Sequence, residues 1–341
     1  MTCAINKTPH SAIFIVCNAD ASSGFGHLLR CLSLAQALRN QQVSVVLAGF
    51  FSDRAQEFIN YFNFEYRLSE QNSIVQTLQG LPKNASVVLD SYAFEIEQLI
   101  ADQRYVLIDD FCRFTSYPVE GVINFTLKAE QYDYLKKDSK SQALGLGYFL
   151  PHPSLHKVPS KFIDQPKKIL IMIGSGDTFG LVSRLVDLIP ALDDNFEVKV
   201  LGTKPEPYSH SSRVRFYPPQ KAVQSFYQWA DLCITSGGLA KYEAAYLEKP
   251  AIVFSQTDAE YEETIEFAEH GLCFDFGLAS RFCSEQFAQS FRSLLANTEK
   301  RRAAYLCATK AFAQNSSHNA VEFIVGCFGA VQKNQESRCL N

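Results

Sequence analysis

The stretch Asn18-Ala-Asp-Ala-Ser-Ser-Gly-Phe-Gly-His-Leu-Leu-Arg30 joins the apolar run Ala12–Cys17 to Cys31–Leu38, whose pattern is helical. A buried strand therefore enters a glycine-rich loop, and the loop opens a helix. This order leaves free backbone N–H groups and the positive end of a helix dipole facing a cleft. Gly24 and Gly26 allow the backbone to turn sharply and to approach a ligand closely.

His27 is expected at the mouth of this cleft. Histidine side chains exchange protons near neutral pH, so His27 is a candidate general base, and Asp20 can orient it or bind a sugar hydroxyl. Two plainer interpretations stay open: a helix-capping histidine in a tight turn, and an Asx-turn made by Asp20. The loop is neither the dinucleotide fingerprint G-x-G-x-x-G nor a phosphate loop ending in Gly-Lys-Ser/Thr.

Length and composition restrict the class of protein. With 341 residues, 47% of them hydrophobic, the chain can form two domains of ordinary size. The net charge of −4 comes without a basic block, so we expect no nucleic-acid partner. No apolar run approaches the roughly 20 residues of a membrane helix, and Met1–Ser11 lacks a signal-peptide pattern. The ten scattered cysteines fit a reducing cytoplasm, and we expect a monomer.

Short apolar runs alternate with helical stretches in each half of the chain, which predicts α/β domains with parallel sheets covered on both faces. The expected strands are Ala12–Cys17, Val43–Ala48, Ser86–Asp90, Arg104–Ile108, Lys168–Ile173, Phe196–Leu201, Val214–Tyr217, Asp231–Thr235 and Ala251–Phe254. We expect Rossmann-like domains at 1–158 and 168–330, a proline-rich linker at 159–167 and a flexible tail at 331–341. The two domains should face each other across a cleft, with helices at the C-terminal end.

The second half repeats the arrangement of strand, glycine turn and helix. In Thr235-Ser-Gly-Gly-Leu-Ala-Lys-Tyr-Glu243, the residues Ser236, Gly237 and Gly238 form a helix N-terminus suited to phosphate oxygens. Glu243 can accept both hydroxyls of a ribose, or it can simply be a favourable negative charge near the start of a helix. Gly174 and Gly176 form another strand-end turn, which can serve the same phosphate site or only make the turn.

Polar residues also end the strands of the first half. Asp90-Ser-Tyr92, Asp109 with Asp110, and Asn124 all follow or close apolar runs, so their side chains can meet the hydroxyls of a bound sugar. A helix cap or turn is the alternative role for the paired aspartates. No histidine or cysteine with ligand spacing supports a metal there, so we expect neither a metal nor a cofactor.

Together these residues resemble one family. Ser23-Gly-Phe-Gly-His-Leu-Leu-Arg-Cys-Leu-Ser-Leu-Ala35 is similar to the G-x-G-H-x-x-R-x-L-x-L-A signature of the UDP-sugar hydrolases of pseudaminic acid biosynthesis. The strand ends quoted above, Gly145-Leu-Gly-Tyr-Phe-Leu150, Ile173-Gly-Ser-Gly-Asp177 and Ser236–Glu243 resemble further family segments. The resemblance implies a GT-B fold, related to glycosyltransferases, and cleavage of UDP-2,4-diacetamido-2,4,6-trideoxy-β-L-altropyranose.

The resemblance also implies roles for residues. His27 matches the catalytic histidine, which would deprotonate a water that attacks the anomeric carbon. The sugar-binding set would be Asp20, Gly26, Tyr92, Asp109 and Asn124, and the UDP-binding set Gly174, Gly176, Ser236, Gly237, Gly238 and Glu243. The UDP leaving group would be stabilised by backbone N–H groups and helix N-termini, without a metal.

Two segments depart from the family. Ser255-Gln-Thr-Asp258 stands where the family has Asn-Gln, and Pro151-His152 stands where it has an arginine. Both fall where sugar and nucleotide contacts are expected, so they bear on which sugar is bound. A glycosyltransferase that passes the sugar from UDP to a polysaccharide or lipid is the alternative function, since Gly-His also occurs in such enzymes. A non-catalytic nucleotide-sugar-binding protein is a third, and it would have little need for His27.

Overall fold

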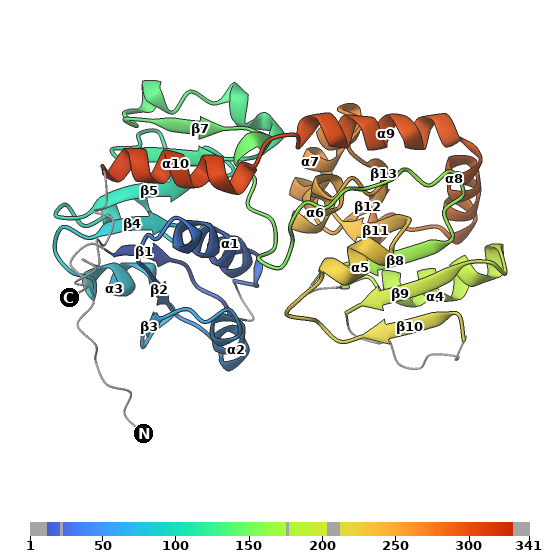
Figure 1. Ribbon diagram of the computed structural model, residues 1–341, viewed down its shortest axis with the longest axis horizontal. Coiled ribbons are helices and arrows are strands. Elements are labelled where there is room, and N and C mark those ends of the chain that lie inside the picture. Colours follow the sequence, from blue (N-terminus) through green and yellow to red (C-terminus); the bar gives the residue numbers. More distant parts are fainter. Residues whose placement is uncertain (1–11, 21–22, 175–176, 203–211, 330–341) are drawn as a thin grey trace, which may run out of the picture. The chain divides into compact units, whose positions relative to one another are not determined.

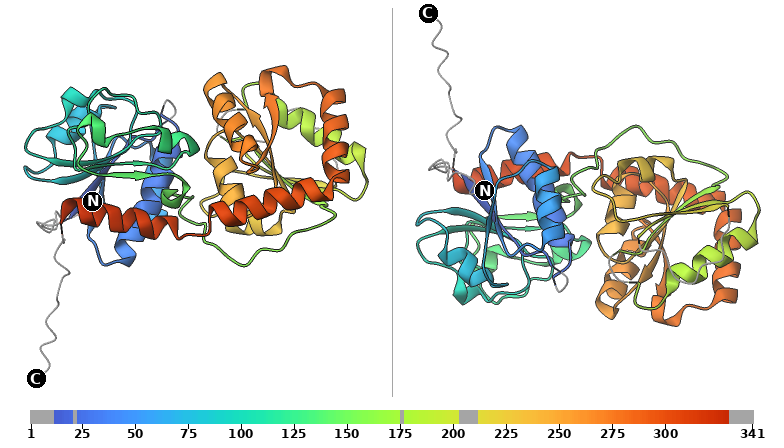
Figure 2. Two further views of the ribbon diagram at one scale, coloured as in Figure 1. Left: turned by 90° about the horizontal axis from the view of Figure 1, so that it is seen from above. Right: turned by 90° about the horizontal axis from the view of Figure 1, so that it is seen from below.

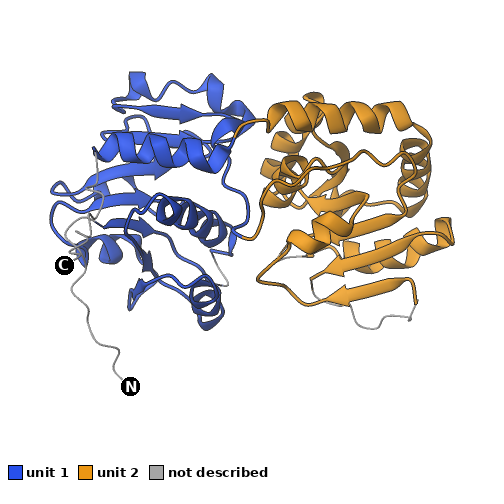
Figure 3. Ribbon diagram, viewed as in Figure 1, with its two compact units in different colours: residues 1–153, 315–341 blue, residues 154–314 orange. Residues whose placement is uncertain are grey.

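The chain folds into two compact α/β units in a computed structural model that describes residues 12–20, 23–174, 177–202 and 212–329. Unit 1 comprises Met1–Pro153 and Asn315–Asn341, and unit 2 comprises Ser154–Gln314 (Figure 3). Each unit is built around one sheet of parallel strands, which confirms the α/β prediction (Figure 1).

Unit 1 has a seven-stranded sheet in the order β3-β2-β1-β4-β5-β6-β7. Its strands are β1 Ile13–Val16, β2 Val45–Gly49, β3 Tyr66–Leu68, β4 Ser86–Leu89, β5 Arg104–Ile108, β6 Gly121–Asn124 and β7 Gln142–Leu144. Its helices are α1 Gly26–Asn40, α2 Asp53–Tyr61, α3 Ile74–Gln79 and α10 Ser316–Phe328. The strand order reverses between β1 and β4, and ligands of such sheets bind beyond the carboxyl ends at that point.

Unit 2 has a six-stranded sheet in the order β10-β9-β8-β11-β12-β13, so its reversal lies between β8 and β11. Its strands are β8 Lys168–Met172, β9 Glu197–Leu201, β10 Val214–Tyr217, β11 Leu232–Ser236, β12 Ala251–Ser255 and β13 Phe274–Leu278. Its helices are α4 Leu181–Leu192, α5 Gln224–Trp229, α6 Leu239–Tyr246, α7 Asp258–Glu269, α8 Ser284–Ala296 and α9 Thr298–Ala311.

Apolar side chains bury the faces of both sheets. In unit 1, Phe14 and Val16 of β1 pack in one cluster with Ile74 and Leu78 of α3. In unit 2, β8 and β11 share a cluster with apolar residues of α4 and α8. Alternate residues of a strand point to opposite faces, and β1 is buried along its whole length, as a strand covered on both faces must be.

Helix α10 corrects the expected domain boundary. It was expected in the second domain, within 168–330, but it packs against α1, β5 and β6 of unit 1 (Figure 2). Gly121 makes room for it, because a Cβ there would lie 2.7 Å from Phe323 Cζ and 2.8 Å from Cys327 Sγ. The chain therefore passes between the units twice, after Pro153 and after Gln314.

The expected linker at 159–167 is also part of unit 2 rather than a free connection. The buried Arg301 donates through Nη2 to the carbonyl of Asp164 and through Nη1 to the carbonyl of Leu294 at the end of α8. Tyr305 OH donates to the carbonyl of Ser160 at 3.2 Å. These contacts hold the segment along α9. The expected tail at 331–341 lies outside the described residues.

His152 gives unit 1 a pH-dependent stability. Burial lowers the pKa of His152 to about 4, from an ordinary value near 6.5. Between these values the unfolded chain binds a proton that the folded protein does not, so the free energy of unfolding falls as pH drops from about 6.5 to 4, by about 2–3 kcal/mol. Urea unfolding of the wild type and of His152→Gln at pH 7 and pH 4.5 checks this. The variant should lose less stability on acidification, and equal losses would contradict the prediction.

Candidate active site

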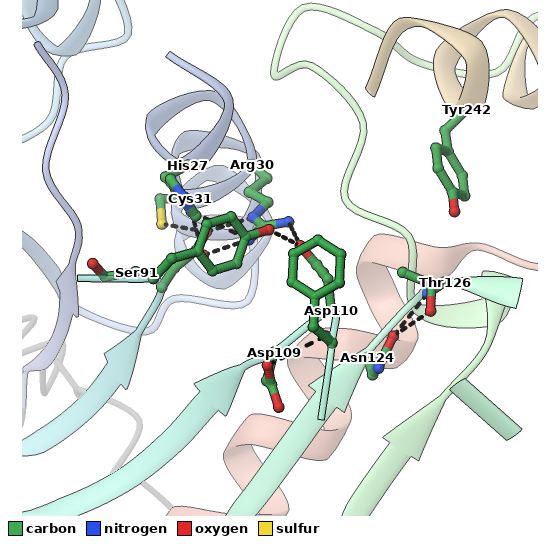
Figure 4. Close-up of polar contacts among 12 residues, drawn as sticks. His27, Arg30, Cys31, Ser91, Asp109, Asp110, Asn124, Thr126 and Tyr242 are labelled. Atoms are coloured by element: carbon green, nitrogen blue, oxygen red, sulfur yellow. Dashed lines mark hydrogen bonds and ion pairs between the residues drawn. The ribbon is translucent and has the colours of Figure 1, made fainter. Parts of the chain in front are cut away.

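A histidine and an aspartate meet at the carboxyl edge of the unit 1 sheet. His27 lies in the first turn of α1, which follows β1, and Asp90 follows the last residue of β4. Because β1 and β4 are neighbours, the two side chains come together: His27 Nδ1 lies 2.7 Å from Asp90 Oδ1. Figure 4 shows His27 and Arg30 on α1, near the strand end that carries Asp110. This is the point of strand-order reversal at which ligands of open α/β sheets bind.

Arg30 fixes the orientation of the Asp90 carboxylate. It lies three residues after His27 on α1, so both side chains project from the same face of the helix. Its guanidinium holds Asp90 with two hydrogen bonds, Nε to Oδ2 and Nη2 to Oδ1, each of 2.6 Å. Its Nη1 donates to Asp110 Oδ2 at 2.7 Å, and Tyr92 OH donates to the same oxygen. The network leaves Asp90 a single orientation toward His27.

The charges of this network decide the protonation of the pair. Burial opposes ionisation of Asp90, but the positive charges of Arg30 and His27 and their hydrogen bonds outweigh it and hold its pKa well below the usual range. An ionised Asp90 can only accept, so whenever the His27 ring is neutral its proton lies on Nδ1 and its Nε2 is the acceptor. Arg30 Nη2 also lies 3.2 Å from Nδ1, but its shorter contact of 2.6 Å is with Asp90 Oδ1. No hydrogen bond to Nε2 is present among the residues that the structure describes. His27 is thus prepared to take a proton.

Two exposed aromatic rings lie beside this pair. The ring of Tyr92 meets the ring of His27 edge-on, with centroids 4.5 Å apart, and the ring of Phe111 lies 5.3 Å from that of Tyr92. Tyr92 is 42% exposed and Phe111 is 53% exposed, unusual values for large apolar side chains beside a buried ion pair. Arg113 donates to the carbonyls of Ser91 and Tyr92 and holds this segment.

Asp109 and Asn124 have internal partners instead of an exposed position. Asp109 is buried and accepts from Tyr117 OH, and it lies 3.6 Å from Arg113 Nε. Asn124 donates to Tyr134 OH at 2.9 Å and accepts from the N–H and hydroxyl of Thr126. The structure therefore brings neither residue into hydrogen-bond contact with His27, and their contact with the sugar stays a prediction.

Asp20 has partners within its own loop and on a neighbouring segment. Its Oδ1 accepts from the N–H of Ser23 at 2.8 Å, three residues on rather than the two of an Asx-turn, and its Oδ2 accepts from Asn72 at 2.6 Å. Gly24 adopts a φ of +71°, which favours glycine. Gly26 is the first residue of α1 and places His27 directly in its first turn.

The unit 2 sheet presents a second set of predicted residues at its own carboxyl edge. Gly174 follows β8, Ser236 ends β11, and Gly238 precedes α6, whose N-terminus has no side-chain cap. Gly237 is packed tightly against α7, because a Cβ there would lie 2.9 Å from Glu260 Cβ and from Ser255 Oγ. These residues therefore do lie at neighbouring strand ends. Gly176, also predicted, lies outside the described residues.

Glu243 lies one turn into α6, with only 6% of its surface exposed. Tyr227 OH donates to Glu243 Oε2 at 2.9 Å. Burial of Tyr227, with the adjacent Glu243 charge, raises the pKa of the phenol well above its ordinary value, so it remains a donor. This bond fixes the orientation of the Glu243 carboxylate, for which the sequence predicts a contact with ribose hydroxyls.

The two segments that depart from the family pattern, Pro151-His152 and Ser255–Asp258, lie in different surroundings. His152 is buried and its ring lies 6.5 Å from that of Phe62, so it has a place in the core of unit 1. Gln256 directly follows β12, and neither Nε2 nor Oε1 has a hydrogen-bond partner among the described residues, although both atoms are buried. Buried amides are normally paired, so this one is an exception, and it lies at the edge where Ser236 and Gly238 lie.

The sequence offered Asp90 and Asp110 as possible contacts of a sugar hydroxyl and gave Arg30 no role, and it did not predict that the three meet at His27. The signals were present: an aspartate after a central strand, and an arginine three residues after the candidate base. Without the strand order, the sequence does not show that the ends of β1, β4 and β5 meet.

Among the described residues no cluster of three or more histidine, cysteine, aspartate or glutamate side chains could hold a metal ion. None of the described helices is long and apolar enough to cross a membrane.

Comparison of sequences finds distant relatives of the chain. No protein-family model matches the chain. It is 23% identical over 280 residues to an uncharacterised protein of Methanocaldococcus jannaschii, an alignment that covers 73% of this chain and 57% of the relative. It is also 23% identical over 274 residues to a Helicobacter pylori protein named pseudaminic acid cytidylyltransferase and UDP-2,4-diacetamido-2,4,6-trideoxy-beta-L-altropyranose hydrolase, covering 76% of this chain and 47% of that one. The chain thus spans about half the length of these curated relatives.

Solved structures with the same fold include proteins named as glycosyltransferases. The spinosyn forosaminyltransferase SpnP matches with a TM-score of 0.64 at 13% identity, over 94% of this chain and 100% of that chain. MurG of Acinetobacter baumannii matches with a TM-score of 0.62 at 14% identity, over 92% and 99%. These likenesses confirm the GT-B-like fold, and the Helicobacter relative confirms the resemblance noted from sequence as a distant one.

Proposed function

We propose that the protein hydrolyses a UDP-linked diacetamido-trideoxy sugar to UDP and free sugar, in the biosynthesis of a nonulosonic acid such as pseudaminic acid. The observation that carries the proposal is the Asp90–His27 pair, with its Nδ1–Oδ1 distance of 2.7 Å and with Nε2 unengaged by any residue that the structure describes. The name of the Helicobacter relative, which includes such a hydrolase, supports the choice of substrate.

The chemistry needs one base and one stabilised leaving group. His27 Nε2 takes a proton from water, and the water oxygen forms a bond to the anomeric carbon as the bond from that carbon to the diphosphate oxygen breaks. The electron pair leaves with UDP. Ionised Asp90 stabilises the imidazolium that forms on His27, as a carboxylate does in other aspartate–histidine pairs. Tyr92 and Phe111 offer rings against which the apolar face of a deoxy sugar can pack.

Unit 2 is the proposed binding site for the nucleotide. Ser236, Gly237 and Gly238 would bind the diphosphate at the N-terminus of α6, where backbone N–H groups and the helix dipole favour negative charge. Gly174 lies at the neighbouring strand end, and the buried amide of Gln256 supplies a further donor and acceptor. Glu243 would accept the ribose hydroxyls.

Acceptor-free turnover tests the function directly. The protein is incubated with UDP-2,4-diacetamido-2,4,6-trideoxy-β-L-altropyranose alone, and UDP is followed by phosphorus NMR. Release of many equivalents of UDP with equal amounts of free sugar is expected. A protein that releases UDP only when a saccharide or lipid acceptor is added would instead be a glycosyltransferase, the second candidate, in which an acceptor hydroxyl takes the place of water at His27.

The role of Glu243 has its own test. Glu243→Gln removes the charge that accepts ribose hydroxyls, and charged hydrogen bonds contribute about 1.5–3 kcal/mol, so affinity for UDP should fall by about tenfold or more. Calorimetry should show that the wild type prefers UDP to 2′-deoxy-UDP and that the variant has lost the preference. Tyr227→Phe, which removes only the hydroxyl bonded to Glu243, should weaken the preference less. An unchanged preference in Glu243→Gln would exclude the ribose contact.

A further inference from the structure

A lysine lies completely buried beneath the proposed diphosphate loop. Lys241, on α6, has 0% of its surface exposed. Its ammonium donates to the carbonyl oxygen of Gly237 and to Glu263 Oε2 at 2.9 Å, and it lies 3.5 Å from Thr264 Oγ1. A buried ammonium is costly unless each proton has an acceptor, and here all three are provided.

The acceptors come from two separate elements. Glu263 and Thr264 belong to α7, and Tyr242 OH donates to the second oxygen of Glu263. The carbonyl of Gly237 belongs to the turn between β11 and α6. Lys241 therefore connects this turn to α7, and Glu263 is in turn fixed by Tyr242. The charge of Glu263 offsets the charge of Lys241 in the protein interior.

The contact at Gly237 dictates where the next N–H group points. A trans peptide is planar, with its carbonyl and its N–H directed to opposite sides. Since the Gly237 carbonyl points inward to Lys241, the N–H of Gly238 in the same peptide must point away from the ammonium. Because glycine stands on both sides of this peptide, its side chains restrict neither orientation, and the contact with Lys241 favours the observed one.

We propose that Lys241 is a positioning residue that locks the Gly237–Gly238 peptide so that the Gly238 N–H donates to a phosphoryl oxygen of a bound nucleoside diphosphate. The inference rests on the proposed function of unit 2 as the nucleotide site. A second observation at the same edge supports a ligand there: the buried amide of Gln256, at the end of β12, lacks a partner among the described residues. Lys241 itself, fully buried, acts only through the peptide.

The test separates the diphosphate from the nucleoside. Dissociation constants of UDP and of uridine are measured by calorimetry for the wild type and for Lys241→Met, a substitution of similar length without charge. The variant should bind UDP about ten- to a hundredfold more weakly, the range of one charge-assisted hydrogen bond, and uridine as the wild type does. The matched control is Lys249→Met, since Lys249 Nζ also donates to a backbone carbonyl of unit 2, that of Ala230, at 2.8 Å. It should change neither constant.

A measurement on the wild-type protein avoids any dependence on the folding of the variant. The amide signal of Gly238 in nitrogen–proton NMR spectra should shift strongly on adding UDP and little on adding uridine. An equal UDP-to-uridine affinity ratio in Lys241→Met and the wild type would overturn the inference, as would an unmoved Gly238 amide in the UDP complex. A wild-type protein that binds neither ligand would instead reject the proposed nucleotide site, so the two failures are distinguishable.

Discussion

His27→Ala should lower kcat for UDP release by about 10²–10⁴-fold, the usual contribution of a positioned general base. Among the described residues Nε2 of the imidazole has no hydrogen-bond partner, and Asp90 at 2.7 Å from Nδ1 orients the ring for proton transfer. The affinity for UDP should stay unchanged, because the proposed nucleotide site lies in unit 2. Steady-state assays of UDP release and calorimetry with UDP check both halves of the prediction.

A second histidine variant controls for general effects of losing an imidazole. His156 is exposed and belongs to unit 2, and only its backbone N–H has a partner, Gln224, among the contacts described. His156→Ala should keep full activity. If His27→Ala retained more than about a tenth of the wild-type rate, far above what the loss of a general base leaves, His27 would not be the base.

Asp90→Asn should have the second largest effect, on both activity and stability. An asparagine can donate its amide proton to His27 Nδ1, which favours the ring tautomer with the proton on Nε2. In that tautomer Nε2 cannot act as a base. Replacing the aspartate of an aspartate–histidine pair by asparagine costs on the order of 10⁴ in kcat. The variant also leaves Arg30 buried with Asp110 as its remaining carboxylate. Loss of one partner of a buried ion pair costs about 3–5 kcal/mol of unfolding free energy.

The stability effect of Asp90 has a defined pH dependence. Despite burial, Arg30 and His27 hold the pKa of Asp90 below its unfolded value near 3.9. The carboxylate's contribution is thus complete above about pH 4 and is lost as pH falls through the folded pKa. The difference in unfolding free energy between wild type and Asp90→Asn should be constant from pH 8 to about 5 and shrink below about pH 4.

A surface carboxylate provides the comparison. Asp194 is almost fully exposed and pairs with Arg213 at 3.0 Å. Exposed ion pairs contribute at most about 1 kcal/mol, so Asp194→Asn should alter neither activity nor the unfolding free energy appreciably. An Asp90→Asn protein that matched Asp194→Asn in both measurements would show that the pairing of Asp90 with His27 has no function.

The sequence predicted the elements around the site well. The order of β1, loop and α1 could be predicted because an uninterrupted apolar run, two glycines and a helical pattern follow one another within Ala12–Leu38. The unit 2 turn at Ser236–Gly238 could be predicted because it also joins an apolar run to a helical pattern through two glycines. Strands β3, β6, β7 and β13 were not predicted. Strands β3 and β7 have only three residues each, most of them partly exposed, and so lack a buried-strand pattern.

The sequence did not predict which way side chains point at the strand ends, or which sheet the last helix packs against. Asp109 and Asp110 are adjacent, and a strand end sends neighbouring side chains to opposite sides. The sequence reading chose Asp109, but Asp110 is the one that contacts Arg30 and Tyr92, while Asp109 pairs with Tyr117 in the core. The position of α10 depends on the space above Gly121, and no local pattern in α10 encodes which sheet it covers.

Hydrolysis in water enriched in oxygen-18 tests the central claim most directly. If His27 activates water for attack on the anomeric carbon, the wild type acting on the UDP-linked diacetamido-trideoxy sugar without an acceptor will release UDP that contains no label, and the label will be in the free sugar. Phosphorus NMR detects the isotope shift at the β-phosphate of UDP. Labelled β-phosphate would mean that water attacks phosphorus instead, and the account of His27 would be contradicted.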